Sequence, residues 1–285
     1  MNYSLIACDL DGTLLDDHSH VAKESLVAIQ QMKHSGVEFA LCTGRTYYEI
    51  PKELREFPEI RYYLYSDGAV VYDKKEQKVI SARYFPAETL DRVLALLEQY
   101  DTMIETYDDG VPKTDARKLN EASYAHYRID PNYLDVIRST RLGLEDFSQT
   151  ARKLTRTEII NVFFADPAER EACFAALQEQ KDLAFTTSMD NNIEIMLRGV
   201  SKGNALLTLA QQLQIPWEQT MAVGDSRNDL SMFAIAGMAV ASGSASPAIQ
   251  QKAGHVACSN NDSIPQYILT HYLKNKGKGE ETHAR

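Results

Sequence analysis

Residues 5–13 read Leu5-Ile6-Ala7-Cys8-Asp9-Leu10-Asp11-Gly12-Thr13. The first four are apolar and unbroken, as in a short strand buried on both faces of a parallel sheet. Two aspartates and a glycine follow at once, where such a strand leaves the sheet. Sites in open α/β sheets lie at the carboxyl ends of the strands, so this stretch predicts both the fold class and the edge that carries the site.

The chain around this stretch alternates between strand-length apolar runs and helical patterns. An apolar helical face repeats through residues 22–32, and Gly36 stands where that helix should end. Strand–helix–strand alternation implies right-handed crossovers, so we expect an α/β fold with a doubly wound, mostly parallel, Rossmann-like sheet. The other strands expected in it span 37–42, 62–65, 70–72, 79–82, 220–223 and 238–241, and its later helices span 203–213, 229–236 and 247–253.

The middle of the chain has a different pattern. Residues 90–97 form an amphipathic helical pattern, 103–110 read as a strand with a turn, and 113–156 are polar with weak periodicity. A strand at 158–165 and a helix from Pro167 to about residue 180 follow. We therefore expect an inserted α+β domain at 84–188, a sheet domain split between 1–83 and 189–273, and a frayed tail at 274–285.

Composition and charge narrow the class of protein. The chain has 285 residues, 44% hydrophobic and 25% charged, which is typical of a soluble globular protein with about two domains. Its net charge of −10 repels phosphate backbones and anionic lipid, which argues against nucleic-acid and membrane-surface roles. Residues 230–251 carry no charge, but the glycines, serines and Pro247 among them indicate buried core rather than a membrane span.

The cysteines and the N-terminus indicate a compartment. Cys8, Cys42, Cys173 and Cys258 form no C-x-x-C pair, which argues against a zinc ribbon or a dithiol redox site and is typical of reduced thiols. The first residues lack the basic start and long apolar run of a signal peptide. These features predict a cytoplasmic protein, and nothing in the sequence indicates its oligomeric state.

Two acidic clusters follow expected strands. Asp9 and Asp11 are two residues apart, so an extended backbone would point both carboxylates to the same side. Asp225 and Asp229 follow the strand at 220–223. Four carboxylates at one mouth repel one another unless a cation lies among them, and hard oxygen ligands favour Mg²⁺. Aspartates that cap turns and helices are the alternative for either cluster alone.

Two further segments suit a phosphate group. Thr43-Gly44 follows the strand at 37–42 and offers a hydroxyl and open backbone N–H groups near a helix start. Lys202 precedes an expected helix and offers a positive charge. Each is weak alone, because a Thr-Gly pair is commonly a turn and a lysine is commonly solvated.

Together these segments resemble the four motifs of the haloacid dehalogenase superfamily, whose phosphatases use an aspartate nucleophile. The inserted domain is similar to the cap of the Cof-type subgroup, which includes many hydrolases of sugar phosphates and other small phosphate esters. In order along the chain, the matching segments are Asp9-Leu10-Asp11-Gly12-Thr13-Leu14-Leu15, Thr43-Gly44-Arg45, Ser201-Lys202-Gly203 and Gly224-Asp225-Ser226-Arg227-Asn228-Asp229.

The resemblance implies a role for each matching residue and a small phosphate monoester, a sugar phosphate or similar metabolite, as substrate. Asp9 would be the nucleophile that forms an aspartyl-phosphate, and Asp11 would be the general acid and base. Mg²⁺ would be held by Asp9, the backbone carbonyl of Asp11 and Asp225, with Asp229 in support. The residues expected to bind the phosphoryl group or the substrate are Thr43, Gly44, Arg45, Lys202 and Asn228.

Some segments outside the four motifs depart from the subgroup's usual pattern, so they bear on the substrate rather than on the chemistry. Asp67 and Ser244 stand where asparagine is usual, and Asn261-Asp262-Ser263-Ile264 replaces a more typical Glu-Asp-Gly-Val. In the insertion, six residues are candidates to face the substrate, with solvated helix faces as the alternative for each: Tyr124, His126, Tyr127, Arg128, Arg152 and Lys153.

Two other functions would use the same residues. A phosphomutase would return the phosphoryl group to a sugar instead of to water, and a catalytically idle regulator would only bind a phosphometabolite. The intact set of aspartates with Lys202 argues against the regulator. Other phosphate and metal motifs are absent: there is no G-x-x-x-x-G-K-[ST] loop, and Leu14 and His20 stand where a calcium loop needs Gly and Glu.

Overall fold

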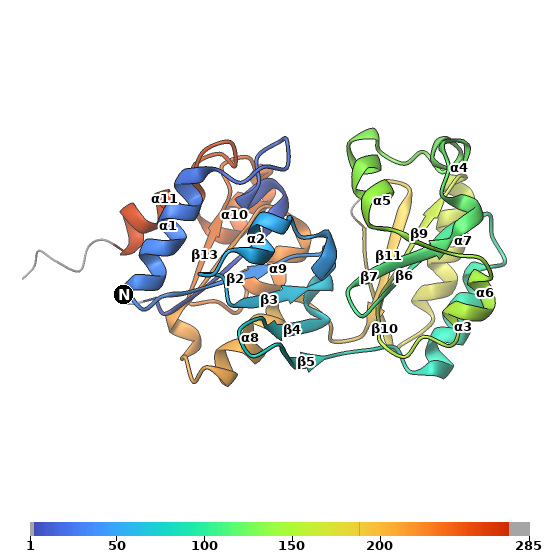
Figure 1. Cartoon of the computed structure of the whole chain (residues 1–285), viewed down its shortest axis with the longest axis horizontal. Coiled ribbons are helices and arrows are strands. Elements are labelled where there is room, and N and C mark those ends of the chain that lie inside the picture. The colour runs from blue at the N-terminus through green and yellow to red at the C-terminus, as the bar shows by residue number, and fades with distance from the viewer. Residues whose placement is uncertain (1–2, 188, 274–285) are drawn as a thin grey trace, which may run out of the picture.

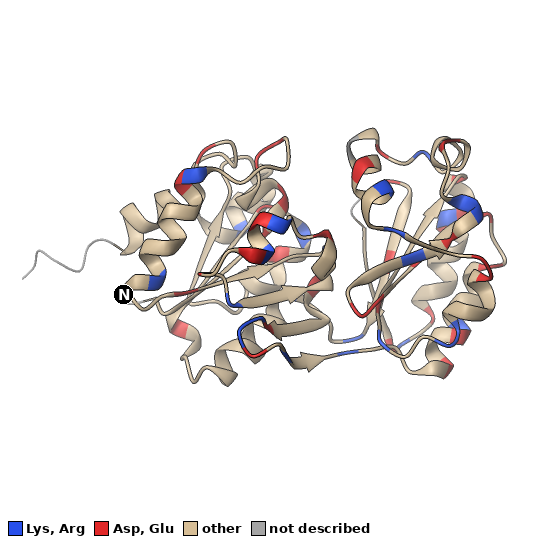
Figure 2. Cartoon of the chain, viewed as in Figure 1, with Lys and Arg blue, Asp and Glu red and all other residues tan. Residues whose placement is uncertain are grey.

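The computed structural model describes residues 3–187 and 189–273, so the tail expected at 274–285 lies outside the described residues. The strands of this part of the chain form an eight-stranded and a six-stranded sheet. Figure 1 shows the two sheets in separate halves of the molecule, joined by the chain segments at 83–86 and 198–201. Acidic and basic residues occur on both halves (Figure 2), so binding of an anion depends on local groups rather than on overall charge.

The strands of the first sheet come from both ends of the chain. They are β1 (Leu5–Cys8), β2 (Glu38–Cys42), β3 (Tyr62–Tyr65), β4 (Val70–Asp73), β5 (Lys78–Ala82), β12 (Thr220–Gly224), β13 (Met238–Ala241) and β14 (Gly254–Val256). Their order is β14-β13-β12-β1-β2-β3-β4-β5, parallel from β14 to β3 and antiparallel from β3 to β5. The expected α/β fold with a mostly parallel sheet is confirmed.

Helices cover both faces of this sheet because its central strands are apolar on both sides. In β1, Ile6 and Cys8 pack with the buried side chains of α1 and α11, whereas Leu5 and Ala7 pack with those of α8, α9 and α10. The helices of this half are α1 (Lys23–His34), α2 (Lys52–Glu56), α8 (Lys202–Gln212), α9 (Leu230–Phe233), α10 (Pro247–Ala253) and α11 (Ile264–Ile268). Within the described ranges of the chain, no helix has the length and apolar character needed to cross a bilayer.

The second sheet is mostly antiparallel and packs its helices around a separate apolar core. Its strands are β6 (Thr102–Asp108), β7 (Val111–Asp115), β8 (Leu142–Leu144), β9 (Thr157–Phe164), β10 (Leu183–Thr186) and β11 (Asn192–Leu197), in the order β10-β11-β9-β6-β7-β8. Its helices are α3 (Ala87–Leu97), α4 (Glu121–His126), α5 (Leu134–Thr140), α6 (Phe147–Ala151) and α7 (Pro167–Gln178). We call this half the cap and the other half the core.

The place of β11 corrects the expected domain boundary. The sequence predicts that the core resumes at residue 189, but β11 pairs antiparallel with β9 and β10 of the cap sheet. Ile193 and Ile195 are fully buried and pack in the same cluster as Ile160 and Val162 of β9. The cap sheet therefore continues to Leu197, and the chain returns to the core with α8.

Candidate active site

Asp9 is positioned by the end of β1 and by the turn that follows it. After β1 the chain turns sharply at Leu10–Leu14, where Asp11 keeps an extended backbone and Gly12 has a φ of 71°. A Cβ at position 12 would lie 2.4 Å from a carboxylate oxygen of Asp225. Gly12 is therefore required both by the left-handed backbone and by the close approach of Asp225. Asp9 itself is only 4% exposed.

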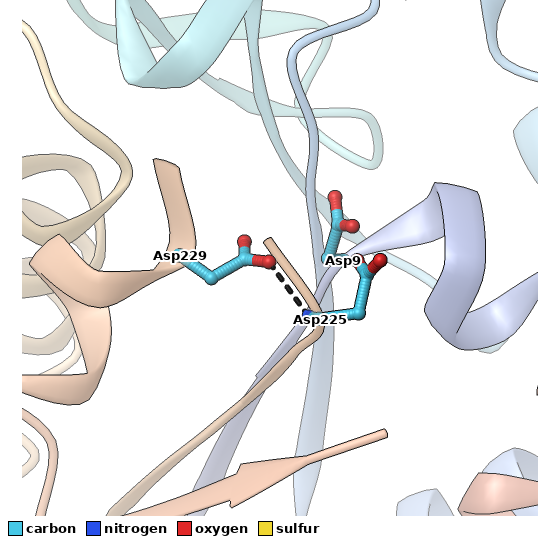
Figure 3. A group of neighbouring side chains, drawn as sticks. All are labelled: Asp9, Asp225 and Asp229. Atoms are coloured by element: carbon cyan, nitrogen blue, oxygen red, sulfur yellow. Dashed lines mark hydrogen bonds between the residues drawn. The ribbon is translucent and has the colours of Figure 1, made fainter. Parts of the chain in front are cut away.

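Three carboxylates from distant parts of the sequence meet at this edge of the core sheet. Asp9, Asp225 and Asp229 each offer an oxygen, and these oxygens all lie within 4.8 Å of one another (Figure 3). Asp229 is held in place by the backbone, since its Oδ2 accepts hydrogen bonds from the N–H groups of Asp225 (2.9 Å) and Ser226 (3.0 Å). Asp229 therefore fixes the loop that carries Asp225.

Lys202 is the positive group of this cluster. It begins α8, whose N-cap Ser201 accepts the N–H of Asn204, and its side chain is 1% exposed. The ammonium donates to Asp9 Oδ1 and to Asp229 Oδ1, both at 2.7 Å. Burial opposes the charge on Lys202, but Asp229 and Asp9 outweigh burial and hold its pKa well above the usual value.

The cluster holds more negative charge than Lys202 neutralises. Burial, followed by the charge of Asp229, raises the pKa of Asp9 well above its usual value, and the same two causes raise the pKa of Asp225 to about 6. A divalent cation among these oxygens would remove the repulsion, and a set of carboxylates is the donor set that Mg²⁺ prefers. The residues present therefore fit a divalent metal ion.

Asp11 lies outside this cluster. Its carboxylate accepts two hydrogen bonds from Arg45, from Nε at 2.9 Å and from Nη2 at 2.6 Å, and its side chain is 56% exposed. Arg45 is held in turn by the backbone oxygen of Glu49, at 2.9 Å. The expected convergence of four carboxylates is therefore corrected to three, because the Asp11 side chain is paired with Arg45 and not with the cluster.

The predicted phosphate-binding residues gather around Asp67, which follows β3. Asn228 donates to Asp67 Oδ1 at 2.9 Å, and a Cβ on Gly44 would lie 3.3 Å from the same oxygen. Thr43 is buried at the end of β2, and its hydroxyl accepts the N–H of Arg45 at 3.1 Å. The charge of Lys202 also acts on Asp67. The fold thus brings Thr43, Gly44, Lys202 and Asn228 to one place.

Asp67 is a site residue that the sequence reasoning did not include. It is 3% exposed, its Oδ2 has no hydrogen-bond partner among the described residues, and burial raises its pKa. The sequence showed Asp67 only as a departure from the subgroup pattern. Asp67 comes directly after a buried parallel strand, at the same edge of the sheet as Asp9 and Thr43, and this position is what could have identified it as a site residue.

A cavity of about 430 Å³ adjoins this site, with Asp67, Lys202 and Asn228 on its core side and Phe174 and Phe185 on its cap side. None of the six cap residues predicted to face the substrate lines it. Four of the six instead pack within the cap. Tyr124 is buried in a cluster with Phe163. Asp101 accepts hydrogen bonds from His126 and Tyr127, and Arg152 forms ion pairs with Asp91 and Glu98. No sequence pattern had pointed to Phe174 or Phe185.

Known proteins are similar to this chain over nearly its whole length. A family model described as haloacid dehalogenase-like hydrolase matches residues 6–268. Phosphatase YwpJ of Bacillus subtilis is 28% identical, over 94% of this chain and 99% of that protein. Pyridoxal phosphate phosphatase YbhA of Escherichia coli is 24% identical, over 96% of this chain and all of that protein. A solved haloacid dehalogenase-like hydrolase from B. subtilis is 29% identical, covers 95% of this chain and has a TM-score of 0.80.

The fold, the site at the strand ends and these relatives define a phosphoric monoester hydrolase, which confirms the predicted enzyme class. The chain belongs to the haloacid dehalogenase-like hydrolase family, in its Cof-type subgroup, as the four motifs predicted.

Proposed function

We propose that this protein is a Mg²⁺-dependent phosphatase that hydrolyses a small phosphate monoester through an aspartyl-phosphate on Asp9. The observation that carries the proposal is the position of Asp9, which is buried, 2.7 Å from the Lys202 ammonium and grouped with Asp225 and Asp229. A carboxylate approaches a phosphate dianion only where positive charge offsets their repulsion, and this site provides it.

We propose that the other motif residues bind the metal ion or the phosphoryl group. Mg²⁺ would be held by Asp9, Asp225 and the backbone carbonyl of Asp11, with Asp229 fixing the loop, and when bound it would neutralise charge on the phosphoryl oxygens. The Thr43 hydroxyl and the Asn228 amide lie at the same edge of the sheet as Asp9. We propose that the phosphoryl oxygens are bound by Thr43, Gly44, Lys202 and Asn228.

Asp11 is the proposed general acid and base. Both of its oxygens accept hydrogen bonds from Arg45 in the structure, and each oxygen keeps a second lone-pair site at which it can carry the proton for the leaving oxygen. Arg45 thereby gains a second role, holding Asp11 at the mouth of the site.

The substrate and the compartment belong to the proposal as well. One relative is a pyridoxal phosphate phosphatase, which supports a small phosphorylated metabolite as the substrate. Cys8, Cys42 and Cys173 are buried free thiols, which supports a reducing compartment such as the cytoplasm. The phosphomutase stays an alternative because it would use the same core residues.

The experiment is phosphate release from 4-nitrophenyl phosphate with and without Mg²⁺, together with a sugar phosphate analysed for both free phosphate and isomerised product. We expect release to require Mg²⁺ and to be abolished in Asp9→Ala, while the exposed control Asp262→Ala keeps wild-type turnover. Wild-type turnover in Asp9→Ala would show that the nucleophile is another residue. Isomerised sugar phosphate in place of free phosphate would identify a mutase.

A further inference from the structure

The cavity beside the phosphate site is large enough for the rest of a bound monoester. It has a volume of about 430 Å³ and lies between the core residues Lys202 and Asn228 and the cap elements α7 and β10. Because Lys202 and Asn228 are the proposed phosphoryl contacts, a leaving group attached to that phosphoryl group has this space within reach. The side chains that line the cavity therefore bear on which leaving group fits.

The cap wall of the cavity is apolar and aromatic. Phe174 of α7 and Phe185 of β10 pack edge to face, with ring centroids 5.6 Å apart and ring planes at 81°. Both rings are half-buried against the cap core, which fixes them in place. A second aromatic ring gains from edge-to-face or offset contact with such a pair in addition to the area that it buries.

The cap wall offers little to a sugar. The side chains that it contributes within the described residues are Phe174, Ala184, Phe185, Thr186, Thr187 and Met196. A sugar presents several hydroxyls that need paired donors and acceptors when buried, and carboxylate, amide and basic side chains provide these. Two threonine hydroxyls can serve one or two ring substituents, but they cannot satisfy a polyol.

The core contributes Arg227 to the same cavity. Arg227 lies between the carboxylate Asp225 and the phosphate contact Asn228, and its side chain is exposed. In the part of the chain that the structure describes, its guanidinium has no hydrogen-bond or ion-pair partner. A planar guanidinium stacks on the face of an aromatic ring. The phenylalanine pair and the face of the Arg227 guanidinium can thus both contact a flat ring.

From these walls we infer that the cavity is a leaving-group subsite for a flat, unsaturated ring, so that the preferred substrates are phosphate monoesters of an aromatic or heteroaromatic alcohol rather than of a sugar. The inference rests on the proposed function, since that function places the phosphoryl group at Lys202 and Asn228. Phe185 is the specificity-determining residue of this subsite, because it joins the phenylalanine pair to the strand that lines the cavity.

The test measures binding, so that it does not depend on turnover. Calorimetry in the presence of Mg²⁺ compares 2-phenylethylphosphonate, the non-cleavable analogue of benzyl phosphate, with the matching phosphonate of glucose 6-phosphate. We expect the wild-type protein to bind the aryl phosphonate at least about tenfold more tightly, as burial of one ring implies. Phe185→Ser should lose most of that preference, and Phe185→Leu, which keeps the apolar volume and the fold, should lose part of it.

Trp217→Ser is the matched control, because Trp217 is an aromatic residue that is 54% exposed and does not line the cavity. It should keep the preference. Equal or tighter binding of the sugar phosphonate by the wild-type protein would overturn the inference, and so would equal weakening of both ligands by the two Phe185 variants. If the aryl phosphonate is preferred but benzyl phosphate releases no phosphate, the subsite stands and the proposed phosphatase function fails.

Discussion

Asp9 and Asp11 are the same residue type two positions apart, yet the structure gives them different surroundings. Asp9 is buried against Lys202, whereas Asp11 is exposed and held by Arg45. A buried carboxylate that faces a cation suits a nucleophile, and an accessible carboxylate that can exchange partners suits proton transfer. The different environments of the two carboxylates therefore support the two different roles that we propose for them.

The role of Asp11 predicts the behaviour of Asp11→Asn. An amide can still accept a hydrogen bond from Arg45 but cannot donate a proton to a leaving oxygen as an acid does. We expect kcat to fall by about 10²–10⁴-fold while the phosphonate ligands bind as tightly as to the wild-type protein. Steady-state kinetics and calorimetry test this, and full activity in Asp11→Asn would refute the acid–base role.

Replacement of Asp67 should strengthen phosphate binding and raise stability, whereas most substitutions in a site weaken both. Its carboxylate is buried beside Gly44 and Asn228, which we propose to bind the phosphoryl group, and one of its oxygens has no described partner. Its negative charge should therefore oppose a bound phosphate. Asparagine tolerates the local φ of 51° and would replace that oxygen with a donor or a neutral acceptor. Asp67→Asn should tighten inhibition by inorganic phosphate and raise stability by about 1–3 kcal/mol.

Phosphate inhibition and chemical denaturation measure these two effects, with the exposed Asp262→Asn as the control. Weaker phosphate inhibition in Asp67→Asn would mean that the Asp67 carboxylate serves the site instead of opposing the anion.

The sequence predicts that Asp9, Asp225 and Asp229 meet beside Lys202, but it wrongly adds Asp11, leaves out Asp67 and does not show how these groups pair. Asp9 and Lys202 are recognisable because each stands where a strand or helix meets the sheet edge. The contact of Asp11 with Arg45 depends on the turn after Asp9, whose geometry is set by the approach of Asp225 to Gly12. Such contacts between distant segments leave no spacing pattern in the sequence.

Strand β9 connects the cap to the turn of the core that carries Asp67. Glu158 accepts the Ser66 hydroxyl at 2.6 Å and the N–H of Gly110 at 2.9 Å. Ser66 in turn donates its backbone N–H to the carbonyl of Arg45 at 2.9 Å. A cap strand therefore supports the turn that carries Asp67 and, through it, the loop of the second motif.

Glu158 predicts a pH dependence of stability. Burial raises its pKa to about 8, and Asp109 and Asp108 add to this effect against the hydrogen bonds from Ser66 and Gly110. In the unfolded chain the Glu158 carboxyl loses its proton at about pH 4.3. Between that pH and 8, the folded state therefore keeps a proton on Glu158 that the unfolded state has lost. Stability should therefore fall as pH rises through this window and level off above it.

The matching variant is Glu158→Gln, which cannot titrate. Its free energy of unfolding in urea should depend less on pH between about 5 and 8 than that of the wild-type protein, whereas the exposed control Glu53→Gln should follow the wild type. Parallel pH curves for Glu158→Gln and the wild type would show that Glu158 does not bind the proton in question.

At the scale of elements, apolar periodicity predicts the core well and the cap poorly. The expected strands at 5–8, 62–65 and 238–241 match β1, β3 and β13, because an uninterrupted apolar run is typical of a strand that is buried on both faces of the sheet. The polar stretch at 113–156 hides β7, β8 and three short helices, whose buried faces are too narrow for a clear period. β11 was assigned to the wrong sheet because strand pairing is non-local.

The whole molecule is held together near the site by a buried ion pair between core and cap. Arg141 of the cap contacts Glu49 of the core and donates to Glu105 Oε1 at 2.9 Å, and the Arg141 side chain is fully buried. The backbone oxygen of Glu49 also accepts the guanidinium of Arg45. The position of the cap is thus tied to the residue that holds Asp11.

Mg²⁺ should stabilise the folded protein, because it removes the repulsion among Asp9, Asp225 and Asp229. At a free concentration of about 100 times its Kd, a ligand that binds only the folded state adds about 2.7 kcal/mol. The temperature of thermal unfolding should therefore rise with Mg²⁺ and fall back when a chelator is added.

The matching variant is Asp225→Asn. It should unfold at a higher temperature than the wild type without metal, and Mg²⁺ should raise its unfolding temperature by less. An equal Mg²⁺ shift in Asp225→Asn would place the metal elsewhere.

Covalent catalysis by Asp9 can be tested by trapping the aspartyl-phosphate intermediate. The protein is mixed with Mg²⁺ and an aryl phosphate, quenched in acid during turnover, reduced with borohydride and mapped by mass spectrometry. Borohydride reduces an aspartyl-phosphate to homoserine, so we expect homoserine at position 9 and unchanged aspartate at positions 11, 225 and 229. Homoserine at another aspartate, or none while phosphate is being released, would contradict covalent catalysis by Asp9.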